Sequence, residues 1–175
     1  MTRQYVTAVA DAGAIILDTR KTAPGLRALD KLAVKLGGGQ NHRFGLFDMA
    51  LIKENHIAAA GGITEAVRRV RTGDAQNHPI EVEVTNLTEL AEVLSLNVDR
   101  IMLDNMRLAE MREAVVVVNG RTPLEASGNI TLENVAQVAA TGVDFISIGA
   151  LTHSVQALDI SFKLKAEGKN QKVES

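Results

Sequence analysis

Short apolar runs alternate with helical patterns along this chain of 175 residues, and the alternation limits the fold more than any other feature. Six runs have the length of strands, and they cover residues 14–17, 50–52, 80–84, 100–103, 124–126 and 145–148. Several are apolar at consecutive positions, as expected for strands that are buried on both faces. Between the runs, apolar residues recur at helical spacing, for example at Leu26, Leu29, Ala33 and Leu36. This order predicts parallel strands joined by right-handed helical crossovers.

Six strand–helix units are fewer than the eight of a complete α/β barrel. We therefore expect an α/β fold of the TIM-barrel type, in which an incomplete, six-stranded parallel barrel occupies residues 1–164. Residues 165–175 are polar and charged and are expected to form a C-terminal tail. The run 115–118 stays open, because its valines favour a strand whereas the preceding pattern favours a helix.

The composition excludes several classes of protein. The chain has no cysteine, so disulfides, thiolate catalysis and cysteine-bound metal sites are excluded. A formal net charge of −2 and an aromatic content of 3% argue against nucleic acid as a partner. No apolar stretch is long enough to span a membrane, and the first residues lack the pattern of a signal peptide. We expect a cytoplasmic protein with no membrane or nucleic-acid partner.

Polar side chains accompany each of the six predicted strands. They form the segments 18–21, 53–56, 104–105, 127–129 and 149–150, together with Glu81 and Glu83 inside the third strand. Parallel barrels place their sites at the carboxyl ends of the strands. Because loops are polar in general, polar residues at the end of one strand need no functional explanation. Polar residues at six successive strands favour a site.

The basic residues of the chain include a group that suggests an anion site. Its members are Arg20, Lys21, His42, Arg43, Lys53 and, less directly, His56. Most lysines and arginines are solvated surface residues, and Arg68, Arg69 and Arg71 on a helix fit that description. The first group does not lie on a helical polar face, so its convergence predicts a pocket for a small polyanion. Arginine grips planar carboxylates with two hydrogen bonds, and lysine acts as a point charge.

Acidic residues stand on two neighbouring strands of the same region. Glu81 and Glu83 alternate with valines, so both face the same side, and Glu83 is nearer the carboxyl end of its strand. Asp104 ends the next strand. These carboxylates can hold Mg²⁺ through water, bind ribose hydroxyls or stabilise a developing cation. The alternative is a structural role as partners of a buried lysine or arginine.

Two glycine-containing turns are candidates for phosphate binding. Ser127, Gly128 and Asn129 follow the fifth strand and precede a helix expected near residue 131, and Gly149 and Ala150 follow the sixth strand. Glycine lets backbone N–H groups approach a phosphate, and barrels often build phosphate sites from their last two units. The glycines at 37–39 follow a helix, so they indicate a helix end. The position of His153 relative to the site is left open.

Seven ordered motifs connect these residues to a known family. They read LDTRKTAPGLR at 17–27, GGGQNHR at 37–43, LIKENH at 51–56, EVEV at 81–84, MLDN at 102–105, EASGN at 125–129 and SIGALT at 147–152. The sequence resembles the quinolinate phosphoribosyltransferases, also called carboxylating nicotinate-nucleotide pyrophosphorylases, over nearly all of residues 2–164. The resemblance implies the synthesis of nicotinate mononucleotide, pyrophosphate and CO₂ from quinolinate and phosphoribosyl pyrophosphate, with Mg²⁺, in NAD biosynthesis.

The resemblance also implies roles for individual residues. Substrate binding is expected from Thr19, Arg20, Lys21, His42, Arg43, Lys53, Glu83 and Asp104, of which Lys53, Glu83 and Asp104 are the expected catalytic residues. The 5′-phosphate is expected at Ser127, Gly128, Asn129, Gly149 and Ala150. No residue is expected to bind the metal directly, and Mg²⁺ is expected near Glu83 and Asp104, bridged by water and substrate.

The front of the chain departs from the family pattern. Members of the family begin with a separate α/β sandwich domain, which this sequence lacks and which would pair with a segment corresponding to 158–164. We therefore expect a homo-oligomer or a partnership with a separate N-terminal domain. The alternative is a non-catalytic truncated barrel that binds dicarboxylate or phosphate, or associates with full-length subunits. A third interpretation is a related barrel transferase that acts on another pyridine or nucleobase.

Overall fold

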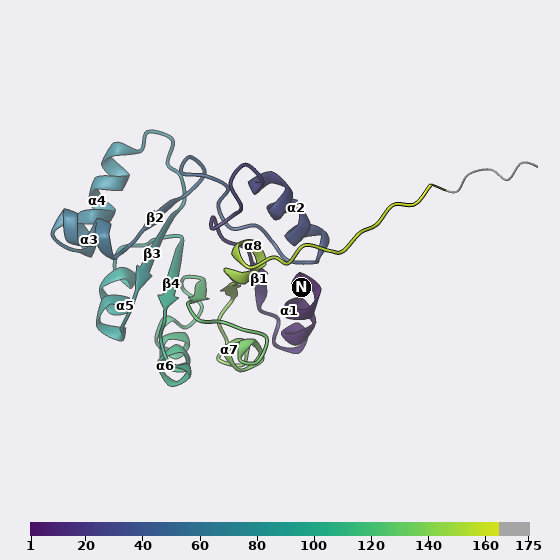
Figure 1. The fold of residues 1–175 in the computed structure, drawn as a ribbon. Helices are drawn as coiled ribbons and strands as arrows, with labels where there is room; N and C mark the ends of the chain where they lie inside the picture. The colour runs from purple at the N-terminus through teal and green to yellow at the C-terminus, as the bar shows by residue number, and fades with distance from the viewer. Residues whose placement is uncertain (165–175) are drawn as a thin grey trace, which may run out of the picture.

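The computed structural model describes residues 1–164, and the expected tail at 165–175 lies outside the described part (Figure 1). The strands are β1 Ile15–Leu17, β2 Ala50–Ile52, β3 Ile80–Val84, β4 Arg100–Asp104, β5 Leu124–Ser127 and β6 Phe145–Ser147. The helices are α1 Thr2–Ala8, the 3₁₀ turn η1 Ala10–Ala12, α2 Arg27–Leu36, α3 Glu54–Ala60, α4 Ile63–Gly73, α5 Leu87–Leu94, α6 Leu108–Val118, α7 Val135–Ala139 and α8 Ala150–His153.

All six predicted strands form, and they make one parallel sheet in the order β1-β6-β5-β4-β3-β2. The edges β1 and β2 are not paired with each other among the described residues, so the barrel is open on this side. Gln40 forms a parallel bridge with Leu17 on the free edge of β1. The prediction of an incomplete six-stranded barrel is therefore confirmed.

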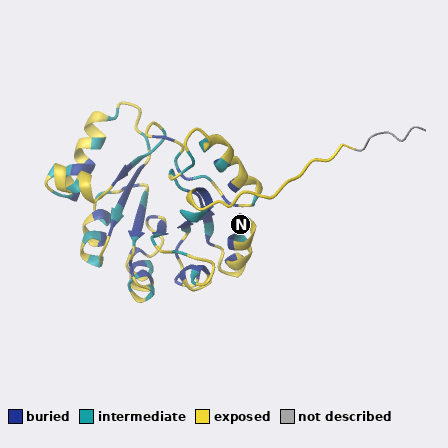
Figure 2. Cartoon of the chain, viewed as in Figure 1, coloured by how far each residue is buried: buried dark blue, intermediate teal, exposed yellow. Residues whose placement is uncertain are grey.

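The core lies between the sheet and the helices around it, and it is aliphatic. Figure 2 shows the strands as mostly buried and the outer faces of the helices as exposed. In β3, Val82 and Val84 are fully buried, and in β4 the same holds for Ile101 and Leu103. In β4 the apolar residues are successive, as expected for a strand that packs on both faces, whereas in β3 they alternate with Glu81 and Glu83.

The helices follow the predicted periodicity with two informative differences. Residues 115–118 belong to α6, so helical continuity prevails over the strand preference of valine. In α2, the helix forms where expected, but Leu29 and Leu36 are exposed, and Lys31 and Val34 are the buried residues. Periodicity therefore located this helix without identifying the face that packs on the barrel. The helix expected near residue 131 begins at Val135.

The C-terminal part of the described chain leaves the barrel. Residues 158–164 contain no helix or strand, and Leu158, Ile160, Phe162 and Leu164 are all exposed (Figures 1 and 2). Within residues 1–164, every helix is too short or too polar to cross a lipid bilayer.

Candidate active site

One cavity of about 850 Å³ opens at the carboxyl ends of the strands. Every residue that the sequence placed in the site lines it: Thr19, Arg20, Lys21, His42, Arg43, Lys53, Glu83, Asp104, Ser127, Gly128, Asn129, Gly149 and Ala150. His153 lines the same cavity, whereas His56 does not and instead accepts a hydrogen bond from the Lys53 N–H at the start of α3. The parallel topology brings most of these positions together because they lie at the carboxyl ends of the strands or directly after them, whereas His42 and Arg43 lie in the segment after α2 that runs along β1.

Two arginines form the cationic part of the cavity. The Nε of Arg20 is buried and has no hydrogen-bond partner within the described residues. Arg43 donates from Nη1 to the carbonyl of Met49 at 3.2 Å. Burial lowers the pKa of Arg43, and repulsion from Arg20 lowers it further, while the charges of Glu81 and Asp48 oppose both effects. Two cations and a buried, unpartnered donor make this region suited to a carboxylate.

Lys53 and Glu83 form an ion pair at the carboxyl ends of β2 and β3. Glu83 is largely buried, whereas about half of the Lys53 side chain is exposed to the cavity. On the neighbouring strand β4, Asp104 accepts a hydrogen bond from the Asn105 side chain at 2.7 Å. Both carboxylates line the cavity and offer oxygen ligands of the kind that Mg²⁺ prefers.

The turn after β5 requires glycine at its centre. Gly128 has a φ of +94°, and a Cβ at this position would lie 2.2 Å from Oδ1 of Asn105. Asn129 donates to the same Asn105 oxygen at 3.0 Å. At the next turn, a Cβ on Gly149 would lie 2.7 Å from Nε2 of His153. At both turns a side chain, Asn105 or His153, occupies the space that a Cβ would need, and both glycines line the cavity, where their backbone N–H groups are candidates for phosphate binding.

We expect the Gly128→Ala variant to be destabilised, because a Cβ would be strained at this φ and would displace Asn105. The cost of such a backbone conformation is about 1–3 kcal/mol. Chemical denaturation of the variant and of a Gly61→Ala control measures it. Gly61 also has a positive φ, of +92°, but it has open space around it, so the control reports the backbone term alone. Equal losses in the two variants would contradict the contact with Asn105.

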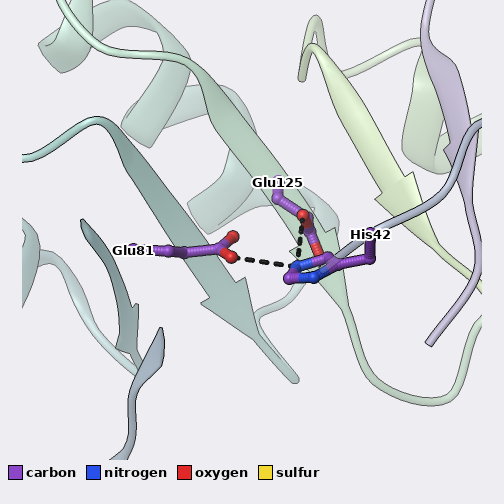
Figure 3. A group of neighbouring side chains, drawn as sticks. All are labelled: His42, Glu81 and Glu125. Atoms are coloured by element: carbon purple, nitrogen blue, oxygen red, sulfur yellow. Dashed lines mark ion pairs between the residues drawn. The ribbon is translucent and has the colours of Figure 1, made fainter. Parts of the chain in front are cut away.

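The floor of the cavity contains buried charged residues. Nε2 of His42 lies 2.9 Å from Glu81 Oε2 and 3.3 Å from Glu125 Oε2, and both carboxylates are fully buried (Figure 3). Arg100 Nη1 lies 3.0 Å from that same oxygen of Glu125. Burial lowers the pKa of His42, but Glu125 and Glu81 outweigh it and raise the pKa to about 9.

A second buried group lies beside this floor and holds the loop that carries His42. Asp18 accepts hydrogen bonds from Lys31 Nζ at 2.5 Å, from Asn41 Nδ2 at 2.5 Å and from the His42 N–H at 2.9 Å. Lys31 also donates to the carbonyl of His42 at 3.0 Å. The loop therefore has fixed contacts to β1 and α2.

Sequence reasoning missed Glu125 and Ser147 as residues of the cavity, and it counted Asn105 among the polar strand ends without giving it a role. Glu125 had a recognisable signal, because a carboxylate within the apolar strand β5 must find a partner in the interior. Asn105 has a φ of +54°, a conformation that the sequence does not reveal. Ser147 has no such signal.

Comparison with known proteins gives the ancestry of this site. A family model described as "Quinolinate phosphoribosyl transferase, C-terminal domain" matches residues 1–163. The chain belongs to this family.

Relatives and solved structures agree with the family match. The chain is 51% identical over 180 residues to a quinolinate phosphoribosyltransferase (decarboxylating) of Nicotiana glauca, covering 91% of this chain and 51% of that protein. A probable nicotinate-nucleotide pyrophosphorylase (carboxylating) of Synechocystis is 49% identical, with 94% and 57% covered. The nicotinate-nucleotide pyrophosphorylase of Francisella tularensis superposes with a TM-score of 0.88 at 48% identity, covering 91% of this chain and 57% of that one. The chain thus spans about half the length of these relatives.

Proposed function

We propose that the cavity transfers the phosphoribosyl group of phosphoribosyl pyrophosphate to quinolinate and decarboxylates the product, giving nicotinate mononucleotide, pyrophosphate and CO₂ in NAD biosynthesis. The observation that carries the proposal is the arrangement of the cavity, in which cations, carboxylates and two glycine turns face one volume. A planar dianion matches the cations, and a sugar carbon that becomes positive matches the carboxylates. The names of the relatives at about 50% identity support the same reaction.

Each part of the cavity has a role in this reaction. Arg20, Lys21, Arg43 and Lys53 bind the quinolinate carboxylates and the pyrophosphate, with Thr19 and His42 beside them. As the ring nitrogen bonds to the sugar carbon, the bond to pyrophosphate breaks, and Glu83 and Asp104 stabilise the charge on the sugar. Loss of CO₂ then leaves an electron pair on the ring carbon, where the adjacent positive nitrogen stabilises it, and this carbon takes up a proton in place of the carboxylate. The turns at Ser127–Asn129 and at Gly149 and Ala150 hold the 5′-phosphate.

Mg²⁺ fits the oxygen ligands of Glu83 and Asp104 better than it fits the floor of the cavity. At the floor, a histidine nitrogen and Arg100 accompany the carboxylates, and neither suits a hard cation. When bound near Glu83 and Asp104, Mg²⁺ supplies positive charge to the departing pyrophosphate. Glu83 and Asp104 position the sugar and hold water molecules beside it.

A second candidate function is that of a non-catalytic module that binds the anion and associates with longer subunits or a separate domain. Two observations favour it: the chain spans about half of its relatives, and Leu29, Leu36 and the apolar residues of 158–164 are exposed. We also propose that the chain forms homo-oligomers, because exposed apolar surface favours association. Cytoplasmic localisation stays a prediction, because named relatives include chloroplastic and mitochondrial proteins.

We expect the Arg43→Ala variant to bind quinolinate about 10- to 100-fold more weakly than the unmodified chain, the range for a lost charge-assisted hydrogen bond of about 1.5–3 kcal/mol. Isothermal titration calorimetry measures the affinity. The control is Arg68→Ala, which removes an arginine that pairs with Glu65 on the exposed face of α4. Absence of quinolinate binding by the unmodified chain would contradict the proposed function.

Product formation separates the two candidate functions. Release of CO₂ and appearance of nicotinate mononucleotide, with phosphoribosyl pyrophosphate and Mg²⁺ present, support the transferase. Quinolinate binding with no product supports the binding module. Product that appears only after addition of the separately expressed N-terminal half of a relative supports a divided enzyme.

A further inference from the structure

The polar atoms of His42 all contact other protein atoms. Its N–H and carbonyl bind Asp18 and Lys31, and its Nδ1 accepts a hydrogen bond from the Arg43 N–H at 2.8 Å. Its Nε2 faces Glu81 and Glu125. The imidazole therefore has no free polar atom for a substrate, although its ring lines the cavity.

The two glutamates approach the ring from different strands. Glu81 comes from β3 and Glu125 from β5, and Figure 3 shows their carboxylates on either side of Nε2. Nε2 has no linear hydrogen bond to either carboxylate, so a hydrogen on Nε2 lies between the two. Glu125 contacts both His42 and Arg100, whereas Glu81 contacts His42.

The Arg43 N–H determines which nitrogen of His42 carries hydrogen. A hydrogen on Nδ1 would face this N–H at 2.8 Å, so Nδ1 must keep its lone pair. Glu125 and Glu81 favour a second hydrogen on the ring and raise the pKa of His42 to about 9, but that hydrogen would have to stand on Nδ1 and would break the contact with the Arg43 N–H. We give this contact more weight, because it opposes the charged ring and is not among the causes of the raised pKa. Burial raises the pKa of Glu81, whereas contacts with His42, Ser147 and Arg100 overcome burial and lower the pKa of Glu125. The geometry thus places the ring hydrogen of His42 on Nε2, between Glu81 and Glu125, with Arg100 beside Glu125.

We propose that Glu81 and Glu125 are positioning residues that hold the His42 ring with its hydrogen on Nε2, so that Nδ1 accepts the Arg43 N–H and fixes Arg43 at the cavity. The proposal rests on the proposed function, because the position of Arg43 affects binding only if Arg43 contacts quinolinate. The arrangement also places negative charge beneath two cations that repel each other. In this account, His42 contributes to binding through Arg43.

A metal ion is a weaker explanation of the same cluster. His42, Glu81 and Glu125 bring three ligand atoms within 4.8 Å of one another. However, Arg100 already contacts the Glu125 oxygen nearest to His42, so a cation there would meet the guanidinium.

Long-range ¹H–¹⁵N spectra of the histidine rings in the full chain show which nitrogen of His42 carries hydrogen, and they need no ligand. We expect His42 at neutral pH to carry hydrogen on Nε2 and a lone pair on Nδ1, and we expect slow exchange of the Arg43 amide. An imidazolium at His42, or hydrogen on Nδ1, would overturn the proposal. Because no substrate is used, this result does not depend on whether the chain binds quinolinate.

Three variants test the consequence for binding. Glu81→Gln keeps an oxygen that can accept the hydrogen on Nε2, so we expect it to lower quinolinate affinity less than Glu81→Leu, which has no acceptor. Glu81→Leu and Glu125→Gln should each lower the affinity about tenfold and speed exchange of the Arg43 amide, and Glu113→Gln on the exposed face of α6 is the control for lost charge. Loss of affinity in Glu81→Gln equal to that in Glu81→Leu would refute the role of Glu81 as an acceptor for the Nε2 hydrogen. If folded Glu81→Leu keeps the affinity for quinolinate and the exchange rate of the Arg43 amide, Glu81 does not position His42.

Discussion

Asp18→Asn is expected to destabilise the protein by about 3–5 kcal/mol, the range found when one member of a buried ion pair is removed. Asp18 is fully buried, and Lys31 is the largest side chain among the residues that are almost completely buried. The substitution preserves the size of the side chain but leaves the Lys31 ammonium without its anion. Urea unfolding measures the change as a lower midpoint with an unchanged slope.

Two further variants identify the cause. Asp11→Asn, on the exposed turn η1, should stay within about 0.5 kcal/mol of the unmodified chain. Adding Lys31→Met to Asp18→Asn removes the unpaired charge and should recover part of the loss, so the two changes are not additive. A loss in Asp18→Asn as small as that in Asp11→Asn would show that this ion pair does not stabilise the fold.

The position of Asp18 explains why this pair also matters for the site. The barrel is open between β1 and β2, and the segment that follows α2 lies along the free edge of β1. The Gln40 N–H donates to Ile16 at 2.8 Å, and the Asp18 N–H donates to Gln40 at 3.2 Å. Asp18 then binds Asn41 and His42 through its side chain. The same residues that close this edge therefore determine where His42 and Arg43 stand.

The sequence was sufficient to predict the sheet and the membership of the cavity. Strand–helix alternation places every strand end at one side, so polar residues as distant as Arg20 and Gly149 converge without any information on contacts. Periodicity was insufficient for α2, because an apolar row on a helix does not say which surface covers it. It gave no sign that Lys31, a residue usually exposed, is buried beside Asp18.

The floor of the cavity shows the limit of prediction from residue type. Glu81 and Glu83 face the same side of β3, as expected, yet they have different environments. Glu83 contacts Lys53 at the cavity, whereas Glu81 is fully buried against His42. A displacement of two residues along one strand thus separates a candidate catalytic carboxylate from a positioning one, and three-dimensional contacts are needed to distinguish them.

The Lys53–Glu83 pair leads to a second large effect, in which affinity and turnover move in opposite directions. Glu83→Gln removes the anion of Lys53, so Lys53 is free to attract quinolinate, and the affinity should be equal to or higher than that of the unmodified chain. The same change removes the charge beside the sugar carbon, and loss of one such stabilising group lowers kcat about 10²- to 10³-fold. Calorimetry with quinolinate and measurement of CO₂ release with phosphoribosyl pyrophosphate and Mg²⁺ give the two values.

Lys53→Ala is the matched variant, because it breaks the same ion pair from the other side. It should weaken quinolinate binding, since it removes a cation and leaves Glu83 to repel the dianion. If both variants lose affinity equally, the pair maintains the shape of the cavity and Lys53 is no ligand of quinolinate. If both retain full turnover, neither side chain takes part in the transfer, and the charge on the sugar must be stabilised by Asp104 alone or by groups outside the cavity described here.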